Sequence, residues 1–247
     1  GTVPVDEVRC WWRRKEEEAL SRRGGDPLAA RVSMLREYPL DDVSCWQSSA
    51  SPQFHPDILA SLASQARPAL ETRPTDSGLM WRVWERPMIG HVYVAGMDFA
   101  DRRPHSVDAT TMQVLDATTR TFVAELHGVR VGPYGAVKTA VEMCRYYNNA
   151  LLIPETIAIG AATADSIRFQ HGYDNVFHTT EIVGAGRVKT EWGWYATQAK
   201  NNDLWSLGQG EINQGGYKMP NGELSGDCGK YDPNKNEHWP DRMRAFA

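Results

Sequence analysis

From residue 91 onward, apolar and polar positions follow patterns that predict a series of strands and helices. The run HVYVAGMD (91–98) is rich in β-branched and apolar residues, and DATTMQVLD (108–116) alternates between apolar and polar positions. A turn is predicted from Asp116 to Arg120, leading into a third extended run, TRTFVAELHG (119–128). Short strand patterns separated by turn residues are typical of hairpin connections. The first three strands are therefore predicted to form an antiparallel meander.

The segments that follow alternate between helical and extended patterns. After Pro133, which suits a first helical turn, apolar positions recur at helical spacing as far as Cys144. The continuous apolar run ALLIPE (150–155) is typical of a strand buried on both faces. Three more elements are predicted: a helix with Ala161, Ala164 and Ile167 on one face and Gly172 at its end, a strand at NVFHT (175–179), and a helix from Gln198 to Ile212. This order predicts an α/β fold in which an antiparallel meander is joined to parallel crossovers.

The first 88 residues have a different character. They contain a charge run at 13–18 and proline-punctuated segments such as EYPLDD and SPQFHPDI. These patterns favour short helices and extended connections over a layered core. We therefore predict an N-terminal, mostly helical or irregular arm over 1–88 and one domain over 89–247. Within that domain, the Gly-rich stretch 213–236 lacks a periodic apolar face and is predicted to form loops or a small hairpin.

Composition narrows the class of protein. A chain of 247 residues with 41% hydrophobic content can bury a substantial core, which excludes disorder throughout. The 27 Lys and Arg against 31 Asp and Glu give a net charge of −4, so there is no global positive excess to indicate nucleic-acid binding, although a local basic groove stays open. The sequence lacks both a signal-peptide pattern and the roughly 18 uninterrupted apolar residues of a membrane span. Four cysteines without a C-x-x-C pair favour neither a zinc knuckle nor a disulfide framework.

Two acidic residues end predicted strands and are candidates for chemistry. Asp98 follows the first strand, and Glu155 follows the apolar run that is its candidate neighbour. Open α/β sheets bind their ligands at such strand ends, and converging carboxylates suit Mg²⁺ or Mn²⁺. Two such ions about 3.5–4 Å apart can activate a water and stabilise the leaving oxygen of a phosphodiester. The alternative is that both acids only make caps or surface ion pairs.

Five short motifs occur in an order that matches a known family. They are Asp98 with Asp108, Tyr147-Asn148-Asn149 before Glu155, Gly172-Tyr173-Asp174-Asn175, Gly193-Trp194, and the following Thr197 and Lys200. With these motifs the sequence resembles the C-terminal nuclease domain of the large terminase subunit of tailed bacteriophages, the DNA-packaging motor. The upstream REYPLDDVSCWQSSASPQFHPDIL is similar to the segment that joins the ATPase and nuclease of that family, so the resemblance covers most of the chain.

The resemblance implies an RNase H-like fold: a mixed sheet, with the antiparallel three-strand meander plus parallel strands, flanked by helices. It also implies a two-metal nuclease centre in which Asp98, Glu155 and Asp241 are the catalytic residues and metal ligands. Asp241 lies in HWPDRMRAFA, which matches a His-Asp-Asp motif that opens the last helix in the family. Trp239-Pro240 departs from that motif, so Asp241 is also open to interpretation as an acid at a helix N-terminus.

Further residues are candidates for auxiliary and DNA-binding roles. Asp108 is either an auxiliary metal ligand or a plain strand-start acid. His238 either orders a water or the scissile phosphate, or is a surface histidine. Phosphate contacts carry most of the affinity of sequence-tolerant DNA binding. The basic candidates are Arg102, Arg103, Arg187, Lys189 and Lys200, each of which has solvated surface as its alternative.

One glycine-containing segment resembles a nucleotide-binding loop only superficially. In GPYGAVKT (132–139), Gly135 stands three residues before Lys138, whereas a P-loop needs glycine immediately before lysine. No ATPase motif is therefore present, and the ATPase domain of the family is expected to lie outside this chain.

The function implied by the resemblance is a metal-dependent endonuclease that cuts concatemeric double-stranded viral DNA during genome packaging. Its cofactor would be Mg²⁺ or Mn²⁺, with two ions. Its partners would be double-stranded DNA, the portal protein, the small terminase subunit and the ATPase domain of the same polypeptide. It would act in the host cell cytoplasm, without secretion or membrane attachment. The alternatives are another RNase H-like nuclease, such as a junction resolvase, and a non-catalytic docking module.

Overall fold

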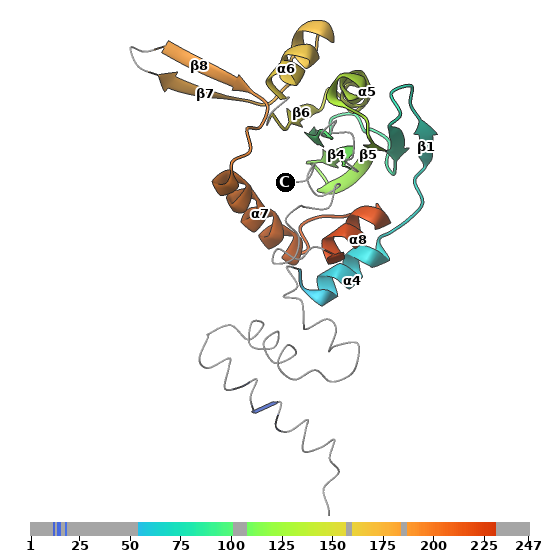
Figure 1. Cartoon of the computed structure of the whole chain (residues 1–247). Coiled ribbons are helices and arrows are strands. Elements are labelled where there is room, and N and C mark those ends of the chain that lie inside the picture. The colour runs from blue at the N-terminus through green and yellow to red at the C-terminus, as the bar shows by residue number, and fades with distance from the viewer. Residues whose placement is uncertain are drawn as a thin grey trace, which may run out of the picture. The chain divides into compact units, whose positions relative to one another are not determined.

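The computed structural model describes residues 54–100, 108–156, 160–183 and 187–230, together with residues 12, 14, 15 and 18. The elements considered below belong to a compact unit that begins at Phe54. In chain order they are α4 (Pro56–Ser64), β1 (Glu71–Pro74), β2 (Met80–Val83), β3 (Tyr93–Asp98), β4 (Ala109–Asp116), β5 (Thr121–Val129), α5 (Pro133–Tyr146), β6 (Leu151–Pro154), α6 (Gly160–Asp165), the π-helix η1 (Ser166–Gln170), β7 (His178–Val183), β8 (Arg187–Trp192), α7 (Gln198–Asn213) and α8 (Gly222–Lys230) (Figure 1). No helix in these ranges is both long and apolar enough to cross a bilayer.

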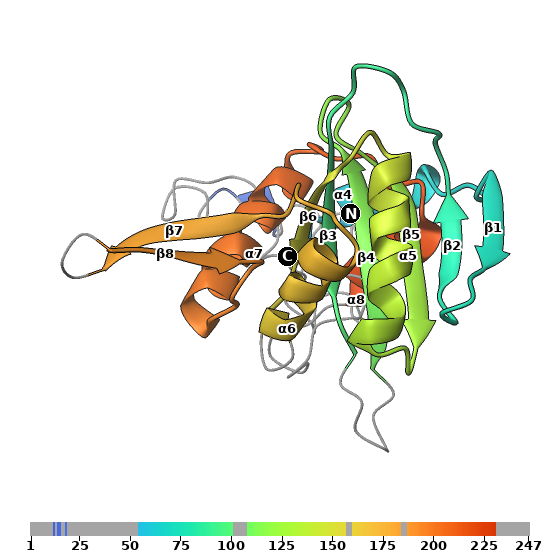
Figure 2. The same ribbon diagram turned by 90° about the horizontal axis from the view of Figure 1, so that it is seen from above.

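A six-stranded sheet with the order β1-β2-β5-β4-β3-β6 forms the centre of this unit. Neighbouring strands are antiparallel except β3 and β6, which are parallel. Helices α5 and α6 lie on one side of the sheet and α4, α7 and α8 on the other, while the β7-β8 hairpin projects away (Figures 1 and 2). The predicted α/β class and the antiparallel meander, formed by β3, β4 and β5, are confirmed.

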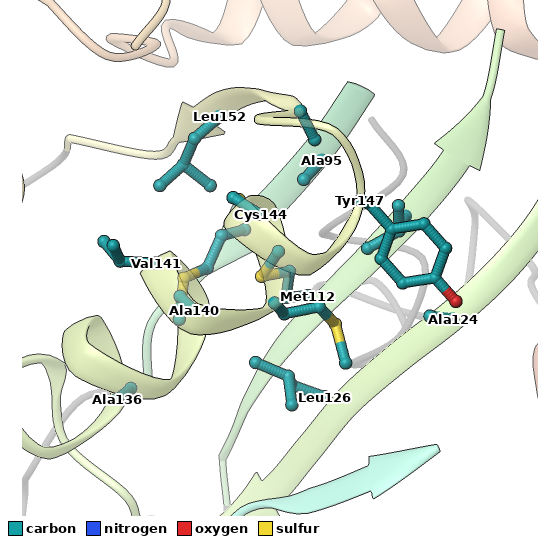
Figure 3. Close-up of a cluster of buried hydrophobic side chains, with 14 of the residues drawn as sticks. Ala95, Met112, Ala124, Leu126, Ala136, Ala140, Val141, Cys144, Tyr147 and Leu152 are labelled. Carbon is teal, nitrogen blue, oxygen red and sulfur yellow. The ribbon is translucent and has the colours of Figure 1, made fainter. Parts of the chain in front are cut away.

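The main hydrophobic core lies between the sheet and α5 (Figure 3). The strand registers create one buried apolar row across β2, β5, β4 and β3, which consists of Trp81, Leu126, Met112 and Met97. Small side chains on α5, among them Ala136, Ala140 and Cys144, let the helix approach this row closely. Burial raises the pKa of Cys144 to about 12, so this thiol is a packing residue rather than a nucleophile.

A second hydrophobic cluster lies among α4, α7, α8 and β5. Its buried members are Phe54, Leu62, Phe122, Ile212, Met219, Leu224 and Cys228. The Phe54 and Trp205 rings meet edge to face with centroids 5.5 Å apart, which joins the start of the unit to α7. The segment before the sheet is therefore packed against elements that follow it by about 150 residues in the sequence.

The sheet begins earlier in the chain than the predicted boundary at residue 88. β1 and β2 lie within residues 71–83, and β2 pairs with the meander through Trp81↔Leu126 and Val83↔Ala124. Each of these strands has only four residues, so the alternation that marks a strand has little length in which to appear. The compact unit starts at Phe54 and therefore extends to both sides of the predicted boundary between residues 88 and 89.

Two C-terminal elements also differ from the sequence expectation. In the segment 175–179, Val176 forms only an isolated parallel bridge with Leu152, and the last two residues, His178 and Thr179, begin β7 of the separate β7-β8 hairpin. Within 213–236, predicted to be loops or a hairpin, the structure has helix α8. The Asn221 side chain caps this helix by accepting from the backbone N–H groups of Glu223 and Leu224. The sequence signal for α8 is an asparagine at the N-cap position, followed by the buried positions Leu224 and Cys228.

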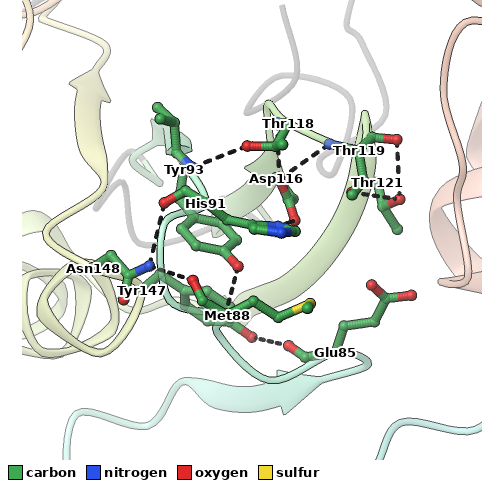
Figure 4. Close-up of polar contacts among 11 residues, drawn as sticks. Glu85, Met88, His91, Tyr93, Asp116, Thr118, Thr119, Thr121, Tyr147 and Asn148 are labelled. Atoms are coloured by element: carbon green, nitrogen blue, oxygen red, sulfur yellow. Dashed lines mark hydrogen bonds and ion pairs between the residues drawn. The ribbon is translucent and has the colours of Figure 1, made fainter.

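A polar network fixes the loop before β3 against the β4-β5 turn (Figure 4). Asp116 Oδ2 lies 2.7 Å from His91 Nδ1, while Oδ1 accepts from the backbone N–H groups of Thr118 and Thr119. Asn148 donates to the carbonyl oxygens of Met88 and His91 on the other side of the loop. Burial raises the pKa of Asp116, but the His91 and backbone hydrogen bonds outweigh it, and the net pKa is lower than usual.

This lowered pKa gives a pH-dependent prediction. A depressed carboxyl pKa stabilises the fold above the unfolded-state pKa of about 3.9 and loses that contribution as the pH falls through the folded-state value. We expect Asp116→Asn to lower the free energy of unfolding by about 2 kcal/mol at pH 7, the usual scale for hydrogen bonds to a charged group. The difference from wild type should shrink below about pH 4, as measured by urea denaturation. The control is Asp76→Asn, at an exposed turn residue, and equal pH profiles for Asp116→Asn and wild type would contradict the assignment.

Candidate active site

Two of the predicted acids lie side by side at the ends of neighbouring parallel strands. The register of β3 and β6 pairs Met97 with Pro154, and the Glu155 N–H donates to the Met97 carbonyl oxygen at 2.8 Å. Asp98 and Glu155 therefore occupy the next positions of the two strands, and side chains at matched positions of a parallel pair share a face. The structure thus brings together the two carboxylates that the strand-end argument singled out.

The sheet face that carries Asp98 is polar and is the face turned away from α5. Met97 belongs to the core beneath α5, so the alternation of β3 turns Asp98 to the other side of the sheet. Across β4 and β5 the registers align Asp98 with Thr111 and Thr111 with His127. Asp98 is 7% exposed and Thr111 is fully buried. Thr111 and His127 could not be predicted as neighbours of this site, because their place in the same cross-strand row as Asp98 depends on strand register.

Trp194 lies beside Glu155 on the outer side of β6. The two residues form a parallel bridge, in which Trp194 N–H donates to the Pro154 carbonyl at 2.8 Å and Thr156 N–H donates to the Trp194 carbonyl at 2.9 Å. Gly193 has φ +84°, and a Cβ there would stand 2.7 Å from the Pro154 carbonyl oxygen. The Gly-Trp motif is thus explained by a close backbone approach that sets Trp194 next to Glu155.

Lys200 is the basic candidate that the structure connects to this pair. Its Nζ lies 5.2 Å from the centroid of the Trp194 ring, within the range of a cation–π interaction. It is in the first turn of α7, where the Thr197 side chain accepts from the Lys200 backbone N–H. The Gly, Trp, Thr and Lys of this segment therefore form one local arrangement: a bridge to β6, a helix cap and a lysine above the indole.

Other motif residues hold β6 in place rather than contributing to the site. Tyr147 donates its hydroxyl to the Glu85 carbonyl at 2.7 Å, and Asn148 and Asn149 both have positive φ, of 53° and 56°. Asn175 donates from Nδ2 to the Asn149 carbonyl at 2.7 Å. Because Asn accepts the left-handed conformation more readily than most residues, this turn ends α5 and sets the chain on the path that ends at Glu155.

Of the remaining acidic candidates, Asp108 is the one that lies within the described residues. Asp108 comes just before β4, and its carbonyl accepts from the Arg130 N–H at 3.3 Å. Within the described ranges there is no group of three or more His, Cys, Asp or Glu residues arranged to hold a metal ion. Asp241, His238, Arg102 and Arg103 lie outside the described residues.

Arg187 and Lys189 lie on β8 of the projecting hairpin (Figure 2). Lys189 Nζ is 2.6 Å from Glu191 Oε1, and this hydrogen bond with its charge raises the pKa of Lys189. The hairpin base is anchored by the Arg168 guanidinium, which stacks on Trp192 at 3.5 Å. Arg187 and Lys189 are both exposed on the β7-β8 hairpin, and Lys189 is already paired with Glu191.

The donor set suits a hard divalent cation. Carboxylate oxygens are the ligands that Mg²⁺ and Mn²⁺ prefer. A carboxylate on a residue that is only 7% exposed, as Asp98 is, gains stability from a bound cation because burial removes most of its hydration. The chemistry of Asp98 and Glu155 therefore suits a divalent cation.

A mixed sheet with an antiparallel meander, a parallel neighbour to its first strand and acids at both strand ends defines an RNase H-like α/β protein. The large terminase nuclease of thermophilic phage G20c with bound magnesium is similar in structure, with a TM-score of 0.55 over 76% of this chain and 93% of that chain at 14% identity. The cobalt-bound form has a TM-score of 0.52 over 71% and 80% of the two chains at 16% identity. The zinc-bound form has a TM-score of 0.52 over 76% and 94% at 15% identity.

The described chain therefore has the fold of a phage large terminase nuclease, as the sequence resemblance predicted. At identities of 14–16% the similarity is one of fold. No protein-family model matches the sequence, and no curated protein is significantly similar to it.

Proposed function

We propose that this chain is a divalent-metal-dependent endonuclease that cuts concatemeric double-stranded viral DNA during genome packaging. The observation that carries the proposal is the juxtaposition of Asp98 and Glu155 at the ends of β3 and β6. It is supported by the terminase nucleases of the same fold that were solved with bound magnesium, cobalt and zinc. A hydrolase of this class needs clustered oxygen ligands at a place where DNA phosphates can approach.

The proposed centre has defined roles for residues of this chain. Asp98, Glu155 and Asp241 would hold the metal ions, with Asp108 as an auxiliary ligand. Mg²⁺ or Mn²⁺, as a pair, would supply activation of the attacking water and stabilisation of the leaving 3′ oxygen. Trp194 would shield the Glu155 side of the centre from bulk water, and Lys200 would neutralise a phosphate there. His238 would help order the scissile phosphate.

The proposed DNA surface combines Lys200 with the other basic candidates, Arg102, Arg103, Arg187 and Lys189. Local cations of this kind are compatible with a net charge of −4, since bound metal ions offset some of the acids. The proposed partners besides DNA are the portal protein, the small terminase subunit and the ATPase domain of the same polypeptide. The proposed place of action is the cytoplasm of the infected host cell.

The function is tested by incubating the chain with supercoiled plasmid and Mg²⁺ or Mn²⁺. The expected products are nicked and linear DNA, which disappear when EDTA is added. A strong preference for branched DNA over linear duplex would instead favour a junction resolvase. Absence of both cleavage and divalent-cation binding would favour a non-catalytic docking module.

Lys200→Ala tests the DNA contact. We expect a loss of affinity for linear duplex of about five-fold at 0.1 M salt, about 1 kcal/mol, without divalent cations so that cleavage does not interfere. Because one phosphate contact is lost, the slope of log K against log salt should fall by about 0.9. Fluorescence anisotropy measures both quantities. The matched control is Lys138→Ala, at an exposed lysine of α5 on the other side of the sheet. Equal affinities and salt slopes for the two variants would remove Lys200 from the DNA surface.

A further inference from the structure

Thr111 has a buried hydroxyl that the fold itself does not use. The residue is fully buried in the middle of the sheet, and its Oγ1 has no hydrogen-bond partner among the described residues. Buried hydroxyls are nearly always hydrogen-bonded, because their lost hydration is otherwise not replaced. An exception within a sheet therefore calls for a ligand or a water as partner.

The adjacent threonine shows how the fold satisfies such a group when its role is structural. Thr110 is equally buried, but its Oγ1 accepts from the Ala100 N–H at 2.9 Å and donates to the Val131 carbonyl. The alternation of β4 puts Thr110 and Thr111 on opposite faces. Thr110 thus faces the side where the chain provides partners, whereas Thr111 faces the side of Asp98.

Thr111 lies next to the Asp98–Glu155 pair in the sheet. The β3-β4 register places Thr111 directly opposite Asp98, and Glu155 occupies the next position on β6. Directly opposed residues of an antiparallel pair have Cβ atoms about 4.5–5.5 Å apart. A neutral hydroxyl is a weaker ligand for a hard cation than a carboxylate, but at that spacing it can hydrogen-bond a water bound to a cation that Asp98 holds.

We propose that Thr111 is a positioning residue of the metal centre: its hydroxyl hydrogen-bonds a water ligand of the divalent cation held by Asp98 and Glu155. The inference rests on the proposed nuclease function. Mg²⁺ keeps several of its waters when it binds to protein carboxylates, and these waters need protein partners. Such partners orient the ligands around the ion, and their removal typically costs about 10–100-fold in metal affinity or activity. Thr111 would acquire its missing partner when the cation binds.

The test is a calorimetric titration of Mn²⁺ into the full chain, without DNA, for wild type and four variants. Thr111→Val keeps the shape of the side chain and removes the hydroxyl, and we expect its Kd for Mn²⁺ to rise about ten-fold. Thr111→Ser keeps the hydroxyl and should stay within about two-fold of wild type. Thr110→Val is the matched control, which should keep the wild-type Kd. Asp98→Asn should abolish binding at this site.

Thermal unfolding without metal separates this role from a structural one. Because Thr111→Val removes an unsatisfied hydroxyl, we expect its Tm to equal or exceed that of wild type, whereas Thr110→Val loses two hydrogen bonds and should melt earlier. If Thr111→Val does not fold, Thr111→Ala provides the same comparison of Kd values.

The outcomes distinguish this inference from the proposed function. Wild-type Mn²⁺ affinity in Thr111→Val, or an equal loss in Thr111→Ser, would overturn the role of the hydroxyl while Asp98→Asn still loses binding. Equal Mn²⁺ binding by wild type and Asp98→Asn would instead overturn the metal centre itself.

Discussion

Asp98→Asn is expected to lower the rate of plasmid cleavage about a thousand-fold, because several kcal/mol of charge stabilisation from the bound ions would be lost. Asparagine is isosteric with aspartate but is a weaker ligand for a hard cation. Asp98 also lies at the end of the parallel β3-β6 pair, where its neighbour is Glu155. No other described acid combines burial with that position, since Asp116 ends β4 at the opposite end of the β3-β4 pair.

The measurement is a time course of supercoiled plasmid loss in Mn²⁺, with purified wild type and variants at equal concentration. Asp116→Asn is the matched control, since it makes the same substitution at a buried strand-end aspartate and should retain near-wild-type cleavage under conditions where it remains folded. Glu155→Gln and Asp241→Asn test the other two proposed ligands in the same assay. Undiminished cleavage by Asp98→Asn, with circular dichroism confirming its fold, would refute the two-carboxylate site.

The elements that the sequence predicts well are those with long, regular patterns. The meander strands and the helix after Pro133 repeat their apolar positions over eight or more residues, apart from the six-residue β3. Asp98 and Glu155 are candidates because both acids end apolar runs, and they converge only if those two strands are neighbours; the parallel pairing of β3 with β6 meets that condition. Strand ends are readable from sequence because hydrophobicity changes there.

The parts that escaped prediction depend on pairing partners instead. β2 is recognisable as a strand only through its register with β5, and Thr111 is a candidate only because it stands opposite Asp98. Trp194 approaches Glu155 because Gly193 permits a close backbone bridge. Nothing in local propensity encodes which strands become neighbours, so such contacts follow from tertiary packing.

The buried polar network next to the candidate site gives the second large expected effect. Glu125 on β5 is fully buried and accepts hydrogen bonds from Arg82 Nη1 at 2.8 Å, Gln113 Nε2 at 2.9 Å and Asn221 Nδ2 at 3.1 Å. Burial lowers the pKa of Arg82, but the charge of Glu125 and its hydrogen bond outweigh this, so the pKa is raised. Arg82 also contacts Glu223 at 3.1 Å, which joins the sheet to α8.

Arg82→Met is expected to lower the free energy of unfolding by about 3 kcal/mol, because it leaves the Glu125 charge buried without its cation. The two amide donors that remain keep the cost near the lower end of the range for broken buried ion pairs. Urea denaturation at pH 7 measures the change. Adding Glu125→Gln to Arg82→Met should recover most of the loss, since a neutral amide no longer requires the cation.

The Arg120–Glu211 pair is a control with the same chemistry in a different environment. Its N–O distance of 2.9 Å matches that of Arg82–Glu125, but its side chains are 59% and 44% exposed against 23% and 0%. Water already solvates both exposed charges, so Arg120→Met should cost less than about 1 kcal/mol. Equal losses for Arg82→Met and Arg120→Met, or a double variant no more stable than Arg82→Met alone, would show that burial of Glu125 does not set the cost. A larger loss at Arg82 would establish that the polar face carrying Asp98 is held by a desolvated charge pair rather than by apolar packing alone.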